Sequence, residues 1–388
     1  MAARTRDSKP RVGFLSPVAF FKGGAERSLF DLMDNPSIKP ILLVTEQGPV
    51  AEEAAKRNID VAIVPFGNVS TIRRPIRVST IFRSIIDWLR AARTLASLAE
   101  SNSIAIIHTN GLKAHSVAAL SSVFGGPPFV SHIRDIAHTW VEKRIWQGLA
   151  RLSAHTILVS HACWPGKSLP ANVSVIYNSV LQSQDQLSRP VRIKDELVVG
   201  ICGRIHPYKG VHLALDWIAA ARNRGINVRL VIRGDAAEEE ASYVRGLESE
   251  VDRLGLRDQV CFEGRKDGLM EIYSGLDAVL VPSSTPDPLP RSVMEAFSFG
   301  IPVIGYPAGG IIEMIEPGCN GWFANSGETF CAAIEEIKEL GPEGTSALRS
   351  MAAKTVEERF SRPRMFAELD TVYRQVLSSK RGRTVSTT

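Results

Sequence analysis

The feature that most constrains the fold is a repeated alternation of short apolar runs with longer stretches of helical periodicity. The apolar runs form two series along the chain. The first series comprises residues 11–15, 40–45, 61–64, 104–108, 128–132 and 155–160. The second series comprises residues 197–202, 228–232, 259–262, 278–281 and 302–305. Because each run is followed by a segment that can cross back, the pattern predicts two α/β domains with parallel sheets covered on both faces.

The alternation lapses once, in a polar stretch rich in Gln, Ser and Asp at residues 181–194. We interpret this stretch as an interdomain linker. A chain of 388 residues also exceeds what one hydrophobic core usually supports. We therefore expect a first Rossmann-like domain at residues 1–180 and a second at 195–360. Residues 361–388 are expected to form a final helix, from Arg362 through Leu377, and then a disordered tail.

Composition excludes several classes of protein. No run of about 18 apolar residues could span a membrane. The basic, polar start of the chain lacks the apolar core of a signal peptide. The five cysteines form no CxxC pair, which favours reduced thiols and a cytoplasmic location. The net charge of +5 is too small to indicate a partner by itself, and no nucleic acid is expected.

Arginines and apolar residues are interleaved at residues 72–93. A basic amphipathic segment of this kind could rest on the anionic inner face of a membrane or meet an anionic acceptor. The other interpretation, which we favour, is a helix packed on its sheet with a solvated arginine face.

A Pro-rich turn at residues 285–290 separates an apolar run from a helical stretch, and this segment carries Asp287 and Glu295. Both carboxylates follow a predicted strand end, which is the edge where open α/β sheets bind ligands. At about 100° per residue, Glu295 lies opposite Val293 and Phe297. We therefore expect a core-facing helix to hold Glu295 away from the core.

A second motif, GRIHPYKG at residues 203–210, lies directly between an apolar run and a helical stretch. Arg204 can bind phosphate oxygens in a bidentate manner, Lys209 supplies a point charge, and a helix N-terminus lies beside them. The motif is thus suited to a diphosphate. Alone it could equally be an exposed basic turn, but its combination with the two carboxylates favours a functional site.

The two motifs together resemble the nucleotide-sugar site of retaining glycosyltransferases of the GT-B fold, in the large family 4. The resemblance rests on the eight-residue spacing of Asp287 and Glu295, on GIPVI at 300–304, on GGIIE at 309–313 and on GRIHPYKG. The family usually has Glu at the first carboxylate position, where this chain has Asp287. The GT-B fold implies two Rossmann-like domains that face a central cleft, and the family implies that the C-terminal helix crosses back onto the first domain.

For the second domain, the resemblance implies roles for individual residues. Arg204 and Lys209 would stabilise the departing diphosphate without a metal, and Asp287 would orient the sugar hydroxyls. Glu295 would accept hydrogen bonds from the nucleotide ribose. Further donor contacts are implied for Leu289, Pro290 and Arg265, with Arg265 placed where contacts with the base begin.

In the first domain, Gly23 and Gly24 lie in a loop that follows the first predicted strand and opens a helix. The resemblance implies that this loop approaches the donor diphosphate or the acceptor. It also implies that His132, at the end of a predicted strand, contacts the transferred sugar. His108 and Asn110 are candidates for the acceptor site. A glycine pair can also be an ordinary tight turn, and most histidines are surface or core residues.

The expected function is therefore the retaining transfer of a sugar from a nucleoside diphosphate to a hydroxyl acceptor, in polysaccharide, glycolipid or small-molecule glycoside synthesis. Two alternatives remain, a GT-B epimerase acting on sugar nucleotides and a non-catalytic module that binds them. Neither a metal nor a cofactor is expected, since the chain has no HExxH, no paired aspartates two positions apart and no GxGxxG after a strand. GKS at residues 166–168 is not a P-loop, because His161 occupies the position of the required glycine.

Overall fold

The computed structural model describes residues 9–20, 24–67, 69, 78–181 and 196–385. It divides the chain into two compact units. Unit 1 comprises residues 1–177 and 365–388, and unit 2 comprises residues 178–364. The expected linker at 181–194 lies almost wholly outside the described residues, as do the first eight residues.

Unit 1 contains a seven-stranded parallel sheet with the strand order β3-β2-β1-β4-β5-β6-β7. Its strands are β1 (Arg11–Ser16), β2 (Lys39–Val44), β3 (Asp60–Ile63), β4 (Ile106–Asn110), β5 (Phe129–Ile133), β6 (His155–Leu158) and β7 (Val173–Val175). Its helices are α1 (Gly24–Met33), α2 (Pro49–Lys56), α3 (Val78–Ser101), α4 (Leu112–Ser121), α5 (Trp140–Leu152) and most of α12 (Arg362–Val385). The register aligns His132 of β5 with Asn110 of β4.

Helices cover both faces of this sheet because successive strand residues point to opposite sides. Phe14 and Leu42 belong to one core, with residues of α1, α2 and α12. Leu15 and Leu43 belong to another core, with residues of α3 and α4. Strands buried on both faces read as continuous apolar runs, which is why the sequence identified them.

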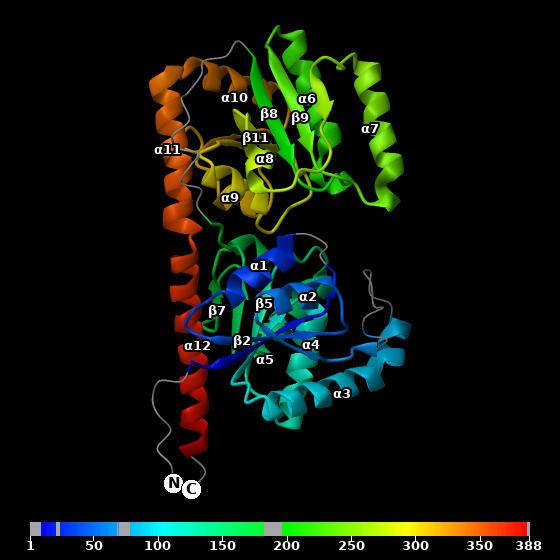
Figure 1. The fold of residues 1–388 in the computed structure, drawn as a ribbon, viewed down its shortest axis with the longest axis vertical. Helices are drawn as coiled ribbons and strands as arrows, with labels where there is room; N and C mark the ends of the chain where they lie inside the picture. The colour runs from blue at the N-terminus through cyan, green and yellow to red at the C-terminus, as the bar shows by residue number, and fades with distance from the viewer. Residues whose placement is uncertain (1–8, 21–23, 68, 70–77, 182–195, 386–388) are drawn as a thin grey trace. The chain divides into compact units, whose positions relative to one another are not determined.

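The last helix, α12, completes the core of unit 1 (Figure 1). Its buried side chains recur at helical spacing and join the core formed by β1, β2, α1 and α2; they are Met365, Leu369, Val372, Tyr373 and Val376. The helix continues through Val385, beyond the Leu377 at which the sequence led us to end it. Part of the segment expected to be a disordered tail is therefore helical.

Unit 2 contains a six-stranded parallel sheet with the order β10-β9-β8-β11-β12-β13. Its strands are β8 (Leu197–Cys202), β9 (Val228–Arg233), β10 (Val260–Phe262), β11 (Ala278–Val281), β12 (Val303–Gly305) and β13 (Gly321–Phe323). Its helices are α6 (Val211–Asn223), α7 (Ala241–Leu254), α8 (Leu269–Tyr273), α9 (Arg291–Ser298), α10 (Gly327–Glu339) and α11 (Gly341–Arg359). The chain builds outward from β8 to β10, then returns to β11 and continues the other way. The neighbours β8 and β11 therefore form a topological switch point, where open α/β sheets bind ligands.

The predicted fold class of two parallel α/β sheets is confirmed, and every predicted strand is present to within a few residues. Two edge strands, β7 and β13, were not predicted. Each has only three residues, which is too short for a recognisable pattern.

The basic segment at 72–93 is only partly within the described residues. In the described half of α3, Ala91, Leu95 and Ala99 are buried in the core that includes Leu15 and Leu43 of the sheet. Ile85 and Ile86 are exposed, with exposed fractions of 42% and 62%. The second half of α3 is thus a packed helix, and Ile85 and Ile86 before it present apolar side chains to solvent. Within the described part of the chain, no helix is both long and apolar enough to cross a membrane.

Candidate functional site

The turn after β8 presents both predicted cations at the switch point of unit 2. A short 3-10 helix at Pro207–Lys209 leads directly into α6. Gly210 joins the two with φ 72°, and a Cβ atom there would lie 2.0 Å from the carbonyl oxygen of Pro282. Only glycine fits at this point. The N-terminus of α6 is thereby held against the end of β11.

Lys209 forms an ion pair with Asp287 across the switch point, with 2.8 Å between Nζ and Oδ2. The two side chains are 27% and 19% exposed, so a ligand can reach the pair. The other carboxylate oxygen of Asp287 accepts a hydrogen bond from the backbone N–H of Leu289 at 3.2 Å. The backbone carbonyl of Asp287 accepts one from Gly310 at 2.8 Å. Asp287 is thus fixed from both sides, and the glycine pair of the sequence motif forms its backbone support.

Arg204 lies in the same turn, where its guanidinium donates a hydrogen bond to the hydroxyl of Tyr208. It lies 5.7 Å from the centre of that ring, and the Lys209 ammonium lies 5.4 Å from it. The Tyr208 ring thus holds two cations on one turn. Sequence reasoning missed this role of Tyr208, although an aromatic residue between two cations was a visible signal.

Glu295, on α9, is buried with an exposed fraction of 8%, and the expectation that it points away from the core was wrong. The helix contributes buried side chains on every face from Val293 to Ser298, because it packs between the sheet and α11. Glu295 accepts hydrogen bonds from the Tyr273 hydroxyl at 3.0 Å and from Nε of Arg291 at 3.3 Å. Burial raises the pKa of Tyr273 well above its ordinary value, so this hydroxyl remains a donor. Neither Tyr273 nor Arg291 was singled out in the sequence.

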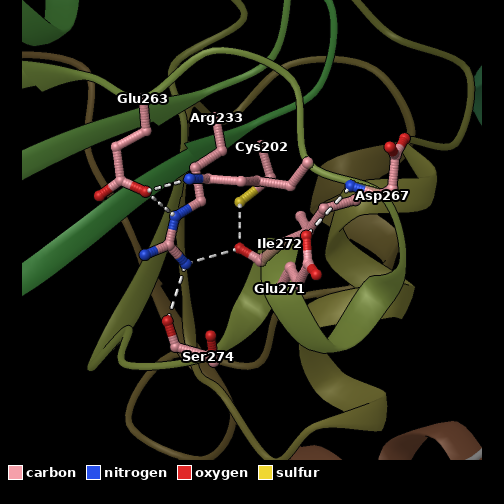
Figure 2. Close-up of polar contacts among 8 residues, drawn as sticks. Cys202, Arg233, Glu263, Asp267, Glu271, Ile272 and Ser274 are labelled. Atoms are coloured by element: carbon pink, nitrogen blue, oxygen red, sulfur yellow. Dashed lines mark hydrogen bonds and ion pairs between the residues drawn. The ribbon is translucent and has the colours of Figure 1, made fainter.

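A third cluster lies at the ends of β8, β9 and β10 (Figure 2). Arg233 is paired with Glu263 at 3.1 Å and donates to the carbonyl oxygens of Ile272 and Ser274 at 2.9 and 2.8 Å. Burial raises the pKa of the neighbouring Cys202 thiol to about 12. The charges of Arg233, Glu295 and Glu263 also act on that thiol, so the cluster adjoins the Glu295 site. Arg233 therefore links Glu263, directly after β10, to the C-terminal end of α8.

The remaining predicted donor residues of unit 2 lie beside these clusters. Arg265, in the connection from β10 to α8, is exposed and lies 3.6 Å from Asp267. Leu289 and Pro290 are buried, and Pro290 is the N-cap of α9. The structure thus brings Lys209 and Asp287 into direct contact. It holds Glu295 in a separate hydrogen-bonded group on the helix that begins after Pro290.

Unit 1 carries the predicted histidines at the ends of β4 and β5. His132 is 1% exposed, and its Nδ1 lies 3.0 Å from Nε2 of His108. Nδ1 of His108 lies 2.8 Å from the hydroxyl of Tyr373 on α12. Burial, assisted by the charge of Arg134, lowers the pKa of His108 to about 3 and that of His132 well below its ordinary value. Both rings are therefore neutral.

This network corrects the expectation for His108 at the acceptor site. His108 is fully buried and both of its ring nitrogens have partners inside the protein, so neither is available to an acceptor. Asn110 is the last residue of β4 and is 8% exposed. Gly24 begins α1 and is exposed, whereas Gly23 lies outside the described residues.

Two parallel sheets in separate units, with a cation and carboxylate pair at a switch point, define an open α/β protein with a candidate ligand site at that point. Comparison with known proteins is more specific. Residues 183–355 match the family model of glycosyl transferases group 1. That region, which is less than half of the chain, is thus similar to the group 1 glycosyl transferases, and the fold of the chain is that of the GT-B glycosyltransferases.

Curated relatives match over part of their length. The N-acetyl-alpha-D-glucosaminyl L-malate synthase of Bacillus anthracis is 30% identical over 160 residues, which is 41% of this chain and 40% of the relative. The lipopolysaccharide 1,2-N-acetylglucosaminetransferase of Salmonella typhimurium is 30% identical over 145 residues, or 36% of this chain and 38% of the relative. The matched region thus spans well under half the length of these enzymes.

Solved structures match over nearly the whole chain. The Anabaena protein Alr3699/HepE in complex with UDP is 23% identical, with a TM-score of 0.77 over 93% of this chain and 98% of that one. A glycosyltransferase from Rickettsia africae is 16% identical, with a TM-score of 0.78 over 96% of this chain and 99% of that one. At these identities the likeness shows the fold.

Proposed function

We propose that the protein is a retaining glycosyltransferase that moves a sugar from a nucleoside diphosphate donor to a hydroxyl acceptor. The observation that carries the proposal is the pair of Lys209 and Asp287 at the switch point of unit 2. A single pair brings together a cation suited to a diphosphate and a carboxylate suited to sugar hydroxyls. The match to the group 1 glycosyl transferases supports the same reading, as do the UDP and UDP-glucose complexes of the Anabaena protein.

In this reaction negative charge grows on the departing phosphate while the sugar approaches an oxocarbenium ion. Lys209 and Arg204 lie on one turn at the N-terminus of α6, where cations and helix N–H groups stabilise an anion as it forms. The proposal needs no metal, because the fixed cations and the helix supply this stabilisation.

The donor would bind along the strand ends of unit 2. Glu295, held by Tyr273 and Arg291, would accept hydrogen bonds from the ribose hydroxyls. Leu289 and Pro290 would approach the sugar or phosphate through their backbone. Arg265 would lie at the base, in the connection from β10 to α8.

Retention of anomeric configuration is proposed to follow from attack on the same face of the sugar. Both oxygens of Asp287 already accept hydrogen bonds, from Lys209 and from the Leu289 N–H. This supports an orienting role for Asp287 and not a role as nucleophile. The departing phosphate would then take the proton of the acceptor hydroxyl.

The acceptor belongs to the class of hydroxyl compounds found in polysaccharides, glycolipids or small glycosides. We propose that the enzyme works in the cytoplasm, and that exposed Ile85 and Ile86 with the neighbouring basic residues of α3 allow contact with an anionic membrane.

The test measures nucleotide release and glycoside formation with a panel of nucleotide sugars, chosen first by the thermal stabilisation that a true donor provides. Lys209→Ala and Arg204→Ala should each lower kcat by about 100-fold or more, as loss of a transition-state donor does. Lys354→Ala, which removes an exposed cation of α11, is the control and should keep full turnover. Near-normal turnover of both site variants would refute the assignment. An incubation with donor alone, analysed for isomerised nucleotide sugar, separates transfer from epimerisation.

A further inference from the structure

The hydrogen bonds around His132 have a single consistent direction. Nδ1 of His132 faces two nitrogen atoms, Nη2 of Arg134 at 3.4 Å and Nε2 of His108 at 3.0 Å. A guanidinium has donors and no acceptor. Nδ1 of His132 must therefore accept, because a proton on it would point at the cation.

The direction of hydrogen-bond donation can be followed through His108 to Tyr373 on α12. If Nδ1 of His132 accepts, Nε2 of His108 must carry the proton that it donates. A neutral imidazole has one protonated nitrogen, so Nδ1 of His108 accepts from the Tyr373 hydroxyl at 2.8 Å. Burial raises the pKa of Tyr373, which keeps this hydroxyl protonated. Tyr373 thus donates a hydrogen bond to His108, and His108 donates one to His132.

The remaining proton of neutral His132 is then on Nε2. That atom is buried and has no hydrogen-bonding partner among the residues that the structure describes. A buried donor without a partner costs about 1–3 kcal/mol, so a protein that retains one usually uses it. An oxygen atom of a ligand would relieve that cost.

We propose that Tyr373 is a positioning residue that, through His108, holds His132 in the Nε2–H tautomer, so that His132 donates a hydrogen bond to an oxygen of the bound sugar substrate. The inference rests on the proposed function and adds to it the direction of the hydrogen bond between His132 and the sugar. His132 is then a donor and not a general base. As the acceptor oxygen bonds to the anomeric carbon and the bond from that carbon to the phosphate oxygen breaks, the acceptor proton goes to the departing phosphate.

The tautomer can be measured without any activity. The full-length protein is labelled with ¹⁵N at histidine, and the ring signals are assigned with His132→Gln and His108→Gln variants. We expect a protonated Nε2 and an unprotonated Nδ1 on His132. His115 is an internal control with the opposite tautomer, because its Nδ1 lies 2.6 Å from Thr109 Oγ1, whose own proton is donated to the carbonyl of Val130. A protonated Nδ1 on His132 would overturn the proposal even if the enzyme transfers sugar.

Tyr373→Phe keeps the ring and removes the donor. Loss of one neutral hydrogen bond should move the tautomer ratio of His132 toward Nδ1–H by roughly 2- to 10-fold. The kcat should fall with the Nε2–H population, while KM for the donor stays nearly constant. Val376→Ala, from the same buried face of α12, should lower the melting temperature and leave the tautomer unchanged. An unchanged ratio in a folded Tyr373→Phe variant would refute the relay, whereas a shifted ratio in a protein without transfer activity would refute only the proposed function.

Discussion

Replacing Tyr273 with Phe should lower the stability of unit 2 and weaken its binding of the donor. The Tyr273 hydroxyl lies 3.0 Å from Oε2 of Glu295, and the two residues are 1% and 8% exposed. A hydrogen bond to a charged group contributes about 1.5–3 kcal/mol, whereas an exposed neutral one contributes less. Water cannot replace the hydroxyl at a buried carboxylate, so the upper part of this range applies. For a unit of this size, a loss of about 2–3 kcal/mol corresponds to a melting temperature lower by roughly 4–12 °C.

The assay is a double-mutant cycle of Tyr273→Phe and Glu295→Gln, followed by calorimetry of the transition of unit 2. Tyr243→Phe is the matched control, since its hydroxyl bonds to His212 at 3.0 Å in an exposed setting and should cost less than about 1 kcal/mol. Because Glu295 would also lose its orientation, KM for the donor should rise by up to about 10-fold, equivalent to 1.4 kcal/mol. A coupling energy below about 0.5 kcal/mol would refute the reasoning, since that is the error of additivity for independent sites.

Three further predictions concern pH, metal and stereochemistry. Burial holds the pKa of both His108 and His115 at about 3 in the folded protein. Below pH 6.5 these two histidines are therefore protonated in the unfolded chain but remain neutral in the folded one. The stability of unit 1 should therefore be full above pH 6.5 and fall as the pH drops toward 3, by on the order of 2 kcal/mol per histidine at pH 5; urea unfolding at pH 7.5 and pH 5 measures this, and equal midpoints would contradict it. Excess EDTA should leave kcat unchanged, and a loss of activity that Mg²⁺ restores would show that the cations of the turn do not suffice. With an α-linked donor, the anomeric proton coupling of the product should indicate an α linkage, and a β product would exclude same-face attack.

Much of the fold was predictable because parallel strands buried on both faces appear as uninterrupted apolar runs. The run at 197–202 became β8, with the bounds Leu197–Cys202. The three-residue strands β7 and β13 gave no such signal, because they depend on pairing with β6 and β12. The continuation of α12 beyond Leu377 was also missed, because its last residues are polar and lack the apolar spacing of the earlier turns.

The candidate site was predictable where it depends on local sequence. Lys209 and Asp287 were identified from motifs that follow strand ends, and the sheet order brings those ends together. The burial of Glu295 could not be inferred, because it depends on α11, which packs on α9 from a distant part of the chain. Tyr273 and Tyr373 each contribute one hydroxyl to a buried group of polar side chains. No pattern of residue spacing in the sequence predicts such a contact.

The return of α12 to unit 1 also affects synthesis of the protein. The ribosome makes residues 1–177 first, yet the apolar face that receives Met365 and Val376 remains open until the final helix emerges. Unit 2 is complete by then, so unit 1 should reach its native state after unit 2. A premature stop before residue 362 would remove Tyr373 and leave that face open to aggregation, even though every strand had been made.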